Sequence, residues 1–299
     1  MCELLGMSAR LPASITISLN EFARHGGETG PHADGWGIAY YDGPDANLIR
    51  ESTSASRSGL MSMLRGYRVE SQIVIAHIRQ ASLGPVELRN THPFRRELAG
   101  RVHSFAHNGD LPGVDGALSL QPGGGAMPIG ETDSEYAFCC LMQRLARLWK
   151  HPARLPTLAA RTEIVAEFAA GIGALGPANF LYSDGDLLFV HGHRRTQADG
   201  SMRAPGLHTI SVACDYGVGR SELGSLTFES SRLQQVVLVS TLPLTDGDWQ
   251  PLAAGELLVL RGGEIVDRVD VAERGRSIRG LPLSASVVGQ RESVATARA

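Results

Sequence analysis

The first hundred residues carry the pattern of a β-rich region with few helices. Residues 2–7 form a short, almost continuous apolar run, which is typical of a buried strand that begins at the second residue. Ser14 is a candidate helix N-cap, so a helix is expected from there to about Arg24. Further strands are expected at residues 35–41, 48–51 and 72–78, and a short helix at residues 60–67.

The centre of the chain changes from strands to helices. A strand is expected at residues 102–106, followed by a Gly- and Pro-rich loop over residues 111–130. Thr132, with Glu135 three positions later, matches the capping box and predicts a helix that runs to about Trp149. A second helix is expected over residues 158–172.

The last third of the chain returns to the period of strands. Residues 179–182 and 187–191 flank a Ser-Asp-Gly-Asp turn and predict a hairpin. The remaining strands are expected at residues 207–213, 235–240, 256–260 and 264–269. Strands, then helices, then strands again predict an α+β protein whose sheets and helices pack in layers, rather than alternating βαβ units.

No linker divides this pattern, so one domain is expected over residues 2–270. Residues 271–299 are rich in Ser, Ala, Arg and Val without clear periodicity, and a mostly disordered tail is expected there.

Composition and charge narrow the class of protein. The chain has 299 residues, of which 43% are hydrophobic, which is ample for a sizeable core. A formal net charge of −3 gives no sign of nucleic-acid binding. The four cysteines contain no CxxC pair, and no apolar run approaches the length of a membrane span. We expect a cytoplasmic globular protein with no nucleic-acid or membrane partner.

Cys2 is the first residue with candidate chemistry. A small second residue permits removal of Met1, which would make Cys2 the N-terminus. Such a residue combines a nucleophilic thiol with an α-amine of pKa about 7.7–8.0, which suits it to act as a base near neutral pH. By itself the signal is weak, because many chains begin with Met-Cys and never use the thiol.

Other segments supply groups for acyl transfer and for binding an amino acid. Asn108 and Gly109 follow a predicted strand, where a carboxamide and a backbone N–H could hold an oxyanion, although a plain Asn-Gly turn fits as well. Arg79 ends another strand and could bind a carboxylate or form a surface salt bridge. Asp133 begins a predicted helix, where it could accept from an ammonium group or only serve the helix dipole. Arg79 and Asp133 together would clamp the α-carbon end of an amino acid whose far end meets Cys2.

The motifs taken together resemble the glutaminase domain of class-II glutamine amidotransferases, and most nearly the stand-alone bacterial, YafJ-type branch. The resemblance covers about residues 2–270 and keeps the order and spacing of the family. It rests on Met1-Cys2-Glu3-Leu4-Leu5-Gly6, Asp34-Gly35-Trp36-Gly37, His77-Ile78-Arg79-Gln80-Ala81-Ser82, Asn90-Thr91-His92-Pro93-Phe94, His107-Asn108-Gly109-Asp110 and Gly130-Glu131-Thr132-Asp133-Ser134-Glu135.

This resemblance implies a fold and a set of catalytic groups. The fold would be the four-layer αββα arrangement of N-terminal-nucleophile (Ntn) hydrolases, with two stacked, mainly antiparallel sheets covered by helices. Cys2 would be the nucleophile, and the Asn108 side chain and the Gly109 N–H would form the oxyanion hole. No metal or organic cofactor is implied. The His-Gly-His at residues 191–193 suggests no third ligand, so no metal site is expected.

The resemblance also implies how substrate is held. Arg79 would bind the α-carboxylate of glutamine and Asp133 its α-ammonium group. Ser82 stands where the family often has a substrate-contacting Thr, and His92, in the motif that borders the pocket, would have a supporting role. Two positions depart from the family: Leu83 replaces a frequent His, and Gln80 stands where relatives often carry an aromatic residue.

The implied activity is hydrolysis of the γ-carboxamide of glutamine through a γ-glutamyl thioester on Cys2, which releases glutamate and ammonia. Three interpretations stay open. The protein could pass ammonia to a separate synthase subunit, since no synthase domain follows residue 270. It could instead be an amidohydrolase that acts on a larger γ-glutamyl amide, like the related ergothioneine-pathway enzyme. It could also be a non-catalytic glutamine-binding protein that keeps the fold.

Overall fold

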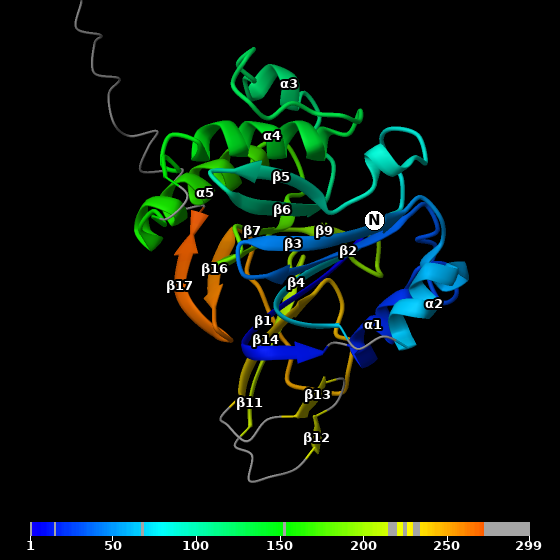
Figure 1. Ribbon diagram of the computed structural model, residues 1–299. Coiled ribbons are helices and arrows are strands. Elements are labelled where there is room, and N and C mark those ends of the chain that lie inside the picture. The colour runs from blue at the N-terminus through cyan, green and yellow to red at the C-terminus, as the bar shows by residue number, and fades with distance from the viewer. Residues whose placement is uncertain are drawn as a thin grey trace, which may run out of the picture.

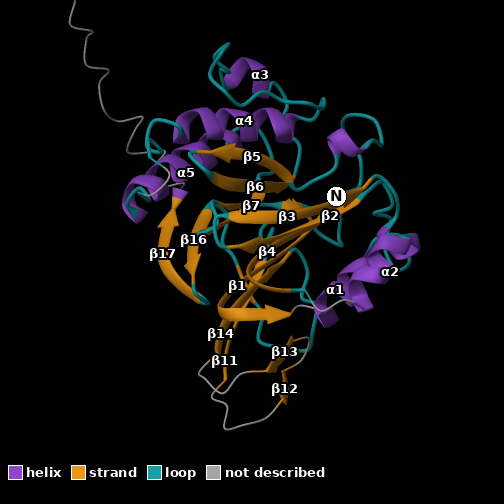
Figure 2. Ribbon diagram, viewed as in Figure 1, coloured by secondary structure: helices purple, strands orange, loops and turns teal. Residues whose placement is uncertain are grey.

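Two large antiparallel β-sheets lie face to face in the computed structural model, and helices cover their outer faces (Figures 1 and 2). The structure describes residues 2–14, 16–66, 69–151, 154–214, 220–223, 226–229 and 234–271. The tail expected over residues 271–299 lies outside the described residues except for Val271.

The first sheet is built around the N-terminal strand. Its strands are β1 (Glu3–Ser14), β2 (Trp36–Asp42), β3 (Asp45–Glu51), β4 (Glu70–Ile78), β11 (His208–Cys214), β12 (Arg220–Leu223), β13 (Leu226–Glu229), β14 (Gln234–Ser240) and β15 (Gln250–Pro251). Their order is β15-β11-β14-β1-β4-β2-β3, and β13 joins β12 to the end of β1. β1 is paired with β14 on one side and with β4 on the other. Its first residue, Glu3, lies opposite Ile78, the last residue of β4.

The second sheet is a meander with one edge extended by the C-terminal hairpin. Its strands are β5 (Phe94–Leu98), β6 (Arg101–Asn108), β7 (Asn179–Ser183), β8 (Leu188–Gly192), β16 (Glu256–Arg261) and β17 (Glu264–Asp270). Their order is β17-β16-β8-β7-β6-β5, and a short ribbon of β9 (Arg195–Thr196) and β10 (Met202–Arg203) stands apart.

Three apolar clusters separate four layers. Leu4, Ile75 and Leu181 belong to the cluster between the two sheets. A second cluster packs the outer face of the first sheet against α1 (Thr16–His25) and α2 (Gly59–Gly66). The third packs the second sheet against α4 (Asp133–Leu145) and α5 (Leu158–Gly173). The fold is therefore α+β and layered, as the sequence pattern predicted, with the four-layer αββα arrangement that the family resemblance implied.

Three short helices complete the described elements. The helix α3 (Val114–Ala117) lies inside the segment expected to be only loop, so that prediction was wrong there. Two 3-10 turns, η1 (Ala55–Arg57) and η2 (Leu88–Asn90), precede α2 and β5.

Two other predictions need correction. β1 is twice as long as expected and reaches Ser14, which pairs with Glu70 and Thr227. The helix that was expected to follow directly from Ser14 is α1, which begins at Thr16. The β1 backbone continues as a strand because neighbouring strands on both sides accept and donate its hydrogen bonds. The strand β5 was not expected, since its Arg-rich sequence buries only Phe94 fully.

Candidate active site

The two sheets bring together the beginning of one strand and the end of another. Cys2 directly precedes β1 in the first sheet, and Asn108 is the last residue of β6 in the second. The Asn108 Nδ2 donates a hydrogen bond to the main-chain carbonyl of Cys2. Asn108 is almost fully buried, and its Oδ1 has no hydrogen-bond partner among the described residues. The contact places a buried carboxamide directly beside the half-buried cysteine.

The Cys2 sulfur is held by the backbone of Gln80. The Sγ–H donates to the Gln80 carbonyl at 3.3 Å, and the Gln80 N–H donates to Sγ at 3.3 Å. Burial raises the pKa of the Cys2 thiol, and the hydrogen bond from the Gln80 N–H opposes that rise. The resting group is therefore a thiol, and a nearby base is needed to form the thiolate.

A small cavity of about 200 Å³ opens over this sulfur. Its lining includes Cys2, Gln80, Asn108 and Gly109. A second, wider cavity of about 650 Å³ shares Ser82 and Asp110 with the first. The wider cavity is walled by Leu83, Leu111, Val114 and Tyr136 together with the carboxylates of Asp110, Asp115, Glu131 and Asp133.

Gly109 occupies a position that only glycine can fill. Its φ is +153°, and a Cβ built on it would lie 1.8 Å from the carbonyl oxygen of Pro177. Within the described part of the chain, no hydrogen bond uses the Gly109 N–H. The missing side chain lets the backbone approach Pro177 closely while the N–H is left available at the cavity.

Arg79 lies next to the nucleophile, but its guanidinium is occupied by the chain itself. Nη1 donates to the Pro85 carbonyl at 3.0 Å, and Nη2 donates to the carbonyls of Leu83 and Gly84 at 2.9 and 3.0 Å. Burial lowers the pKa of Arg79. Arg79 lines neither cavity, so its expected contact with a carboxylate stays a prediction, and in this structure it folds the segment after β4.

Asp133 opens the helix α4 at the wall of the wider cavity. Its Oδ1 accepts from the Ser134 N–H at 2.7 Å, and its Oδ2 accepts from the Leu111 N–H at 2.6 Å. His107, the residue before Asn108, reaches the same helix start, with its Nδ1 at 2.9 Å from the Ser134 Oγ. The backbone partners orient the Asp133 carboxylate, which is half-buried and faces the cavity.

Ser82 and His92 occupy very different positions. Ser82 lines both cavities, and its Oγ donates to the Asp110 Oδ1 at 2.5 Å. His92 is only 4% exposed and lines neither cavity. Its ring packs between the rings of His77 and Phe94, tilted to both, with centroid distances of 4.3 Å to each. The structure therefore does not bring His92 to the cavity, and any effect it has must pass through packing.

Sequence reasoning missed several groups that shape the site. The Gln80 backbone holds the sulfur, although only the Gln80 side chain had been considered. Asp34 accepts from the Ala81 N–H at 2.8 Å and braces the segment beside the sulfur. Asn179 lies behind Asn108 with no motif around it that could have singled it out. Such supporting contacts depend on which strands become neighbours, which no local pattern reveals.

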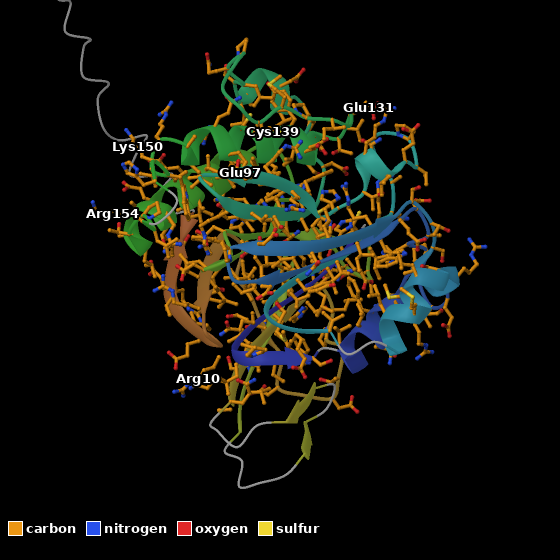
Figure 3. The ribbon with its side chains drawn as sticks, in the orientation of Figure 1. Arg10, Glu97, Glu131, Cys139, Lys150 and Arg154 are labelled. Atoms are coloured by element: carbon orange, nitrogen blue, oxygen red, sulfur yellow. The ribbon has the colours of Figure 1, made fainter. Side chains whose placement is uncertain are left out.

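The other candidate groups do not join this site. Cys139, labelled on α4 in Figure 3, is fully buried. His191 is buried and its Nδ1 lies 2.6 Å from the Ala178 carbonyl. Among the residues that the structure describes, no group of three or more His, Cys, Asp or Glu could hold a metal ion. None of the described helices is long and apolar enough to cross a membrane.

Comparison with known sequences identifies the family. A sequence model of the class-II glutamine amidotransferases matches residues 1–279. The chain belongs to this family. It is 36% identical to the putative glutamine amidotransferase YafJ of Escherichia coli K12 over 271 residues, which is 89% of this chain and 100% of YafJ.

Solved structures of amidotransferases share the fold. The crystal structure of a predicted glutamine amidotransferase from Pseudomonas aeruginosa PA01 is 35% identical, with a TM-score of 0.62 over 89% of this chain and 100% of that one. Glutamine phosphoribosylpyrophosphate amidotransferase of B. subtilis is 15% identical, with a TM-score of 0.54 over 90% of this chain and 49% of that one. The latter likeness concerns the fold alone. This class-II amidotransferase is thus an enzyme built on two stacked sheets.

Proposed function

We propose that this class-II amidotransferase is a glutaminase in which Cys2, exposed by removal of Met1, attacks the γ-carboxamide of glutamine. The observation that carries the proposal is the meeting of Cys2, the Asn108 carboxamide and the Gly109 N–H around one small cavity. The glutaminase unit would be residues 2–270. The roles proposed for the other residues are those that the family resemblance implies.

The reaction begins with transfer of the Cys2 thiol proton to its own α-amine, because burial keeps the sulfur protonated at rest. The sulfur then forms a bond to the carboxamide carbon. The resulting oxyanion accepts from the Asn108 Nδ2 and the Gly109 N–H, and a donor of this kind typically contributes about 3 kcal/mol. The α-ammonium passes its proton to the leaving nitrogen as the C–N bond breaks, and ammonia departs. Water then attacks the γ-glutamyl thioester, the C–S bond breaks, and glutamate is released.

Groups beside the wider cavity would bind the α-ammonium and α-carboxylate groups of glutamine. Asp133 would accept from the α-ammonium group, and Ser82 would contact the substrate through its hydroxyl. Arg79 would take the α-carboxylate only after exchanging its bonds to the Leu83 and Gly84 carbonyls for bonds to the ligand. His92 would support the site only indirectly, through its packing against His77 and Phe94. A separate synthase subunit would receive the ammonia if the protein serves biosynthesis.

A second candidate is hydrolysis of a γ-glutamyl amide larger than glutamine, and the wider cavity favours it. That cavity adjoins the small cavity over the Cys2 sulfur, with which it shares Ser82 and Asp110, and has roughly three times its volume. Its apolar wall includes Leu83, where many relatives carry a His. Turnover of free glutamine, compared with turnover of γ-glutamyl amides that carry larger leaving amines, separates the two candidates.

The test of the central proposal combines mass and rate measurements. The intact mass is measured before and after treatment with a diazo-ketone analogue of glutamine. The expected result is a starting mass that lacks Met1 and one adduct that maps to Cys2. Cys2→Ala should abolish turnover and keep the fold, while Cys140→Ala, which also removes one thiol, should keep turnover. Full activity of Cys2→Ala would overturn the mechanism, and a retained Met1 without an adduct would favour a glutamine-binding protein.

A further inference from the structure

Asn179 lies directly behind the proposed oxyanion hole. It is the first residue of β7, it is fully buried, and it pairs with Asn108 across the β6–β7 ladder. Its Nδ2 donates to the main-chain carbonyl of Asn108 at 3.2 Å. This carbonyl belongs to the same peptide group as the Gly109 N–H.

The hydrogen bonds of Asn179 leave its carboxamide only one orientation. Nδ2 also donates to the Arg194 carbonyl at 2.9 Å, and Oδ1 accepts from the His193 N–H at 2.7 Å. Carbonyl oxygens can only accept and a backbone N–H can only donate, so a flipped amide would oppose all three partners. Neighbouring backbone confines the group as well, since a Cβ on Gly206 would lie 1.7 Å from Oδ1.

The planarity of the peptide group carries this constraint to the cavity. In a trans peptide, the C=O and the N–H point in opposite directions. When Asn179 holds the Asn108 carbonyl on the buried side, the Gly109 N–H is turned to the opposite side, where Gly109 lines the cavity over Cys2. We infer that Asn179 is a positioning residue that aims the Gly109 N–H at the oxyanion.

This inference rests on the proposed function, because an oxyanion forms only if Cys2 attacks an acyl carbon. The competing interpretation is structural: Asn179 would merely tie β7 to the turn at residues 193–194. The two interpretations differ in which reactions of Cys2 they affect. Amide hydrolysis passes through an oxyanion, whereas alkylation of the thiolate by iodoacetamide does not, and only the first depends on the direction of the Gly109 N–H.

The experiment compares Asn179→Asp and Asn179→Ala with wild type. Asn179→Asp keeps the shape but sets an oxygen against the Asn108 carbonyl, and Asn179→Ala removes the donor. The matched control is Gln234→Glu, because Gln234 is also a buried carboxamide that bridges backbone groups, accepting from and donating to Leu11 at 3.0 Å. Leu11 is nine residues from Cys2 in the sequence, and neither Leu11 nor Gln234 lines either cavity. Thermal unfolding, kcat, KM and the rate of iodoacetamide labelling mapped to Cys2 are measured for each protein.

We expect both Asn179 variants to lose about 10- to 100-fold in kcat, somewhat less than removal of a whole oxyanion donor, with KM unchanged within about 2-fold. Labelling of Cys2 should keep its wild-type rate, and Gln234→Glu should change neither reaction. If hydrolysis and labelling fall together, or if kcat is retained, the inference is overturned. Should either variant not fold, Asn179→Ser replaces it, and failure of all three to fold makes the role structural. A wild-type protein that hydrolyses no γ-glutamyl amide overturns the proposed function itself and this inference with it.

Discussion

Asn108 donates from its side chain to the main-chain carbonyl of Cys2, so the last residue of a strand in one sheet is bonded to the residue that precedes a strand in the other. The amide nitrogen carries two protons, and one of them remains for a ligand. The same side chain can therefore orient the nucleophile and stabilise charge that develops beside it. This shared use makes the geometry of the site depend on how the two sheets are stacked.

Gly109→Ala should abolish most of the activity by moving the backbone of the oxyanion hole. A Cβ there would meet the Pro177 carbonyl at 1.8 Å, so the peptide must shift. We expect kcat to fall by about 100-fold or more, as when an oxyanion donor is lost. Gly59→Ala is the matched control, because nothing lies within 4 Å of a Cβ at Gly59. A Gly109→Ala enzyme with wild-type kcat would exclude the Gly109 N–H as a donor.

Arg79→Gln should distinguish an arginine that binds substrate from one that only folds the loop. If Arg79 takes the α-carboxylate, the variant should raise KM for glutamine by about 10-fold or more, and should affect 4-aminobutyramide, which lacks that carboxylate, far less. Equal losses for both amides would assign Arg79 to the Leu83–Pro85 carbonyls alone. Steady-state kinetics on the two substrates provide the measurement.

Asp133→Asn should weaken binding of the substrate ammonium group. The neutral amide keeps the size of the side chain but removes the charge and sets an NH₂ group against the Leu111 or Ser134 N–H. KM for glutamine is expected to rise by about 10-fold or more, while iodoacetamide labelling of Cys2 keeps its rate. Unchanged KM would show that the carboxylate serves only the start of α4.

Acid should destabilise the fold through its buried imidazoles. Burial lowers the pKa of His77 to about 3 and that of His92 well below its usual value. In the unfolded chain each imidazole takes up a proton as the pH falls through about 6.5, whereas in the folded protein the same ring stays neutral at that pH. Stability is therefore complete above that pH and falls below it, by at most about 1.4 kcal/mol per pH unit for each ring. Denaturant unfolding from pH 7.5 to 4.5 should show this, and a His92→Gln variant with an undiminished slope would refute it.

His25 should show the opposite dependence on pH. Its Nδ1 lies 2.7 Å from the carboxylate of Glu3, and this hydrogen bond raises the pKa of His25. The raised pKa means that the stabilising contribution is present below about pH 6.5 and is lost as the pH rises through the folded-state value. His25→Gln should therefore destabilise the protein more at pH 6 than at pH 8.5. An equal loss at both values would show that the pair is not ionic.

Local signals in the sequence predicted much of the fold. Thr132 was expected to cap α4, and its Oγ does accept from the Glu135 N–H at 3.2 Å. The return bond of the capping box is absent from the described contacts of Glu135, whose carboxylate instead binds the Gly130 N–H and Arg96. The cap joins residues three positions apart, whereas the bond to Arg96 depends on where β5 comes to lie.

The sequence by itself determined the residue types at the site and the layered class of fold, because a nucleophile, carboxamide, glycine and apolar periods can be read from short segments. The tertiary structure alone decided how these groups meet. Asn108 reaches Cys2 across 106 positions of sequence only because the two sheets stack. Arg79 binds backbone carbonyls because the segment after β4 folds back over it, and Asn179 stands behind Asn108 because β6 and β7 pair in one register. Hydrogen bonds between distant segments follow from packing, which no local pattern encodes.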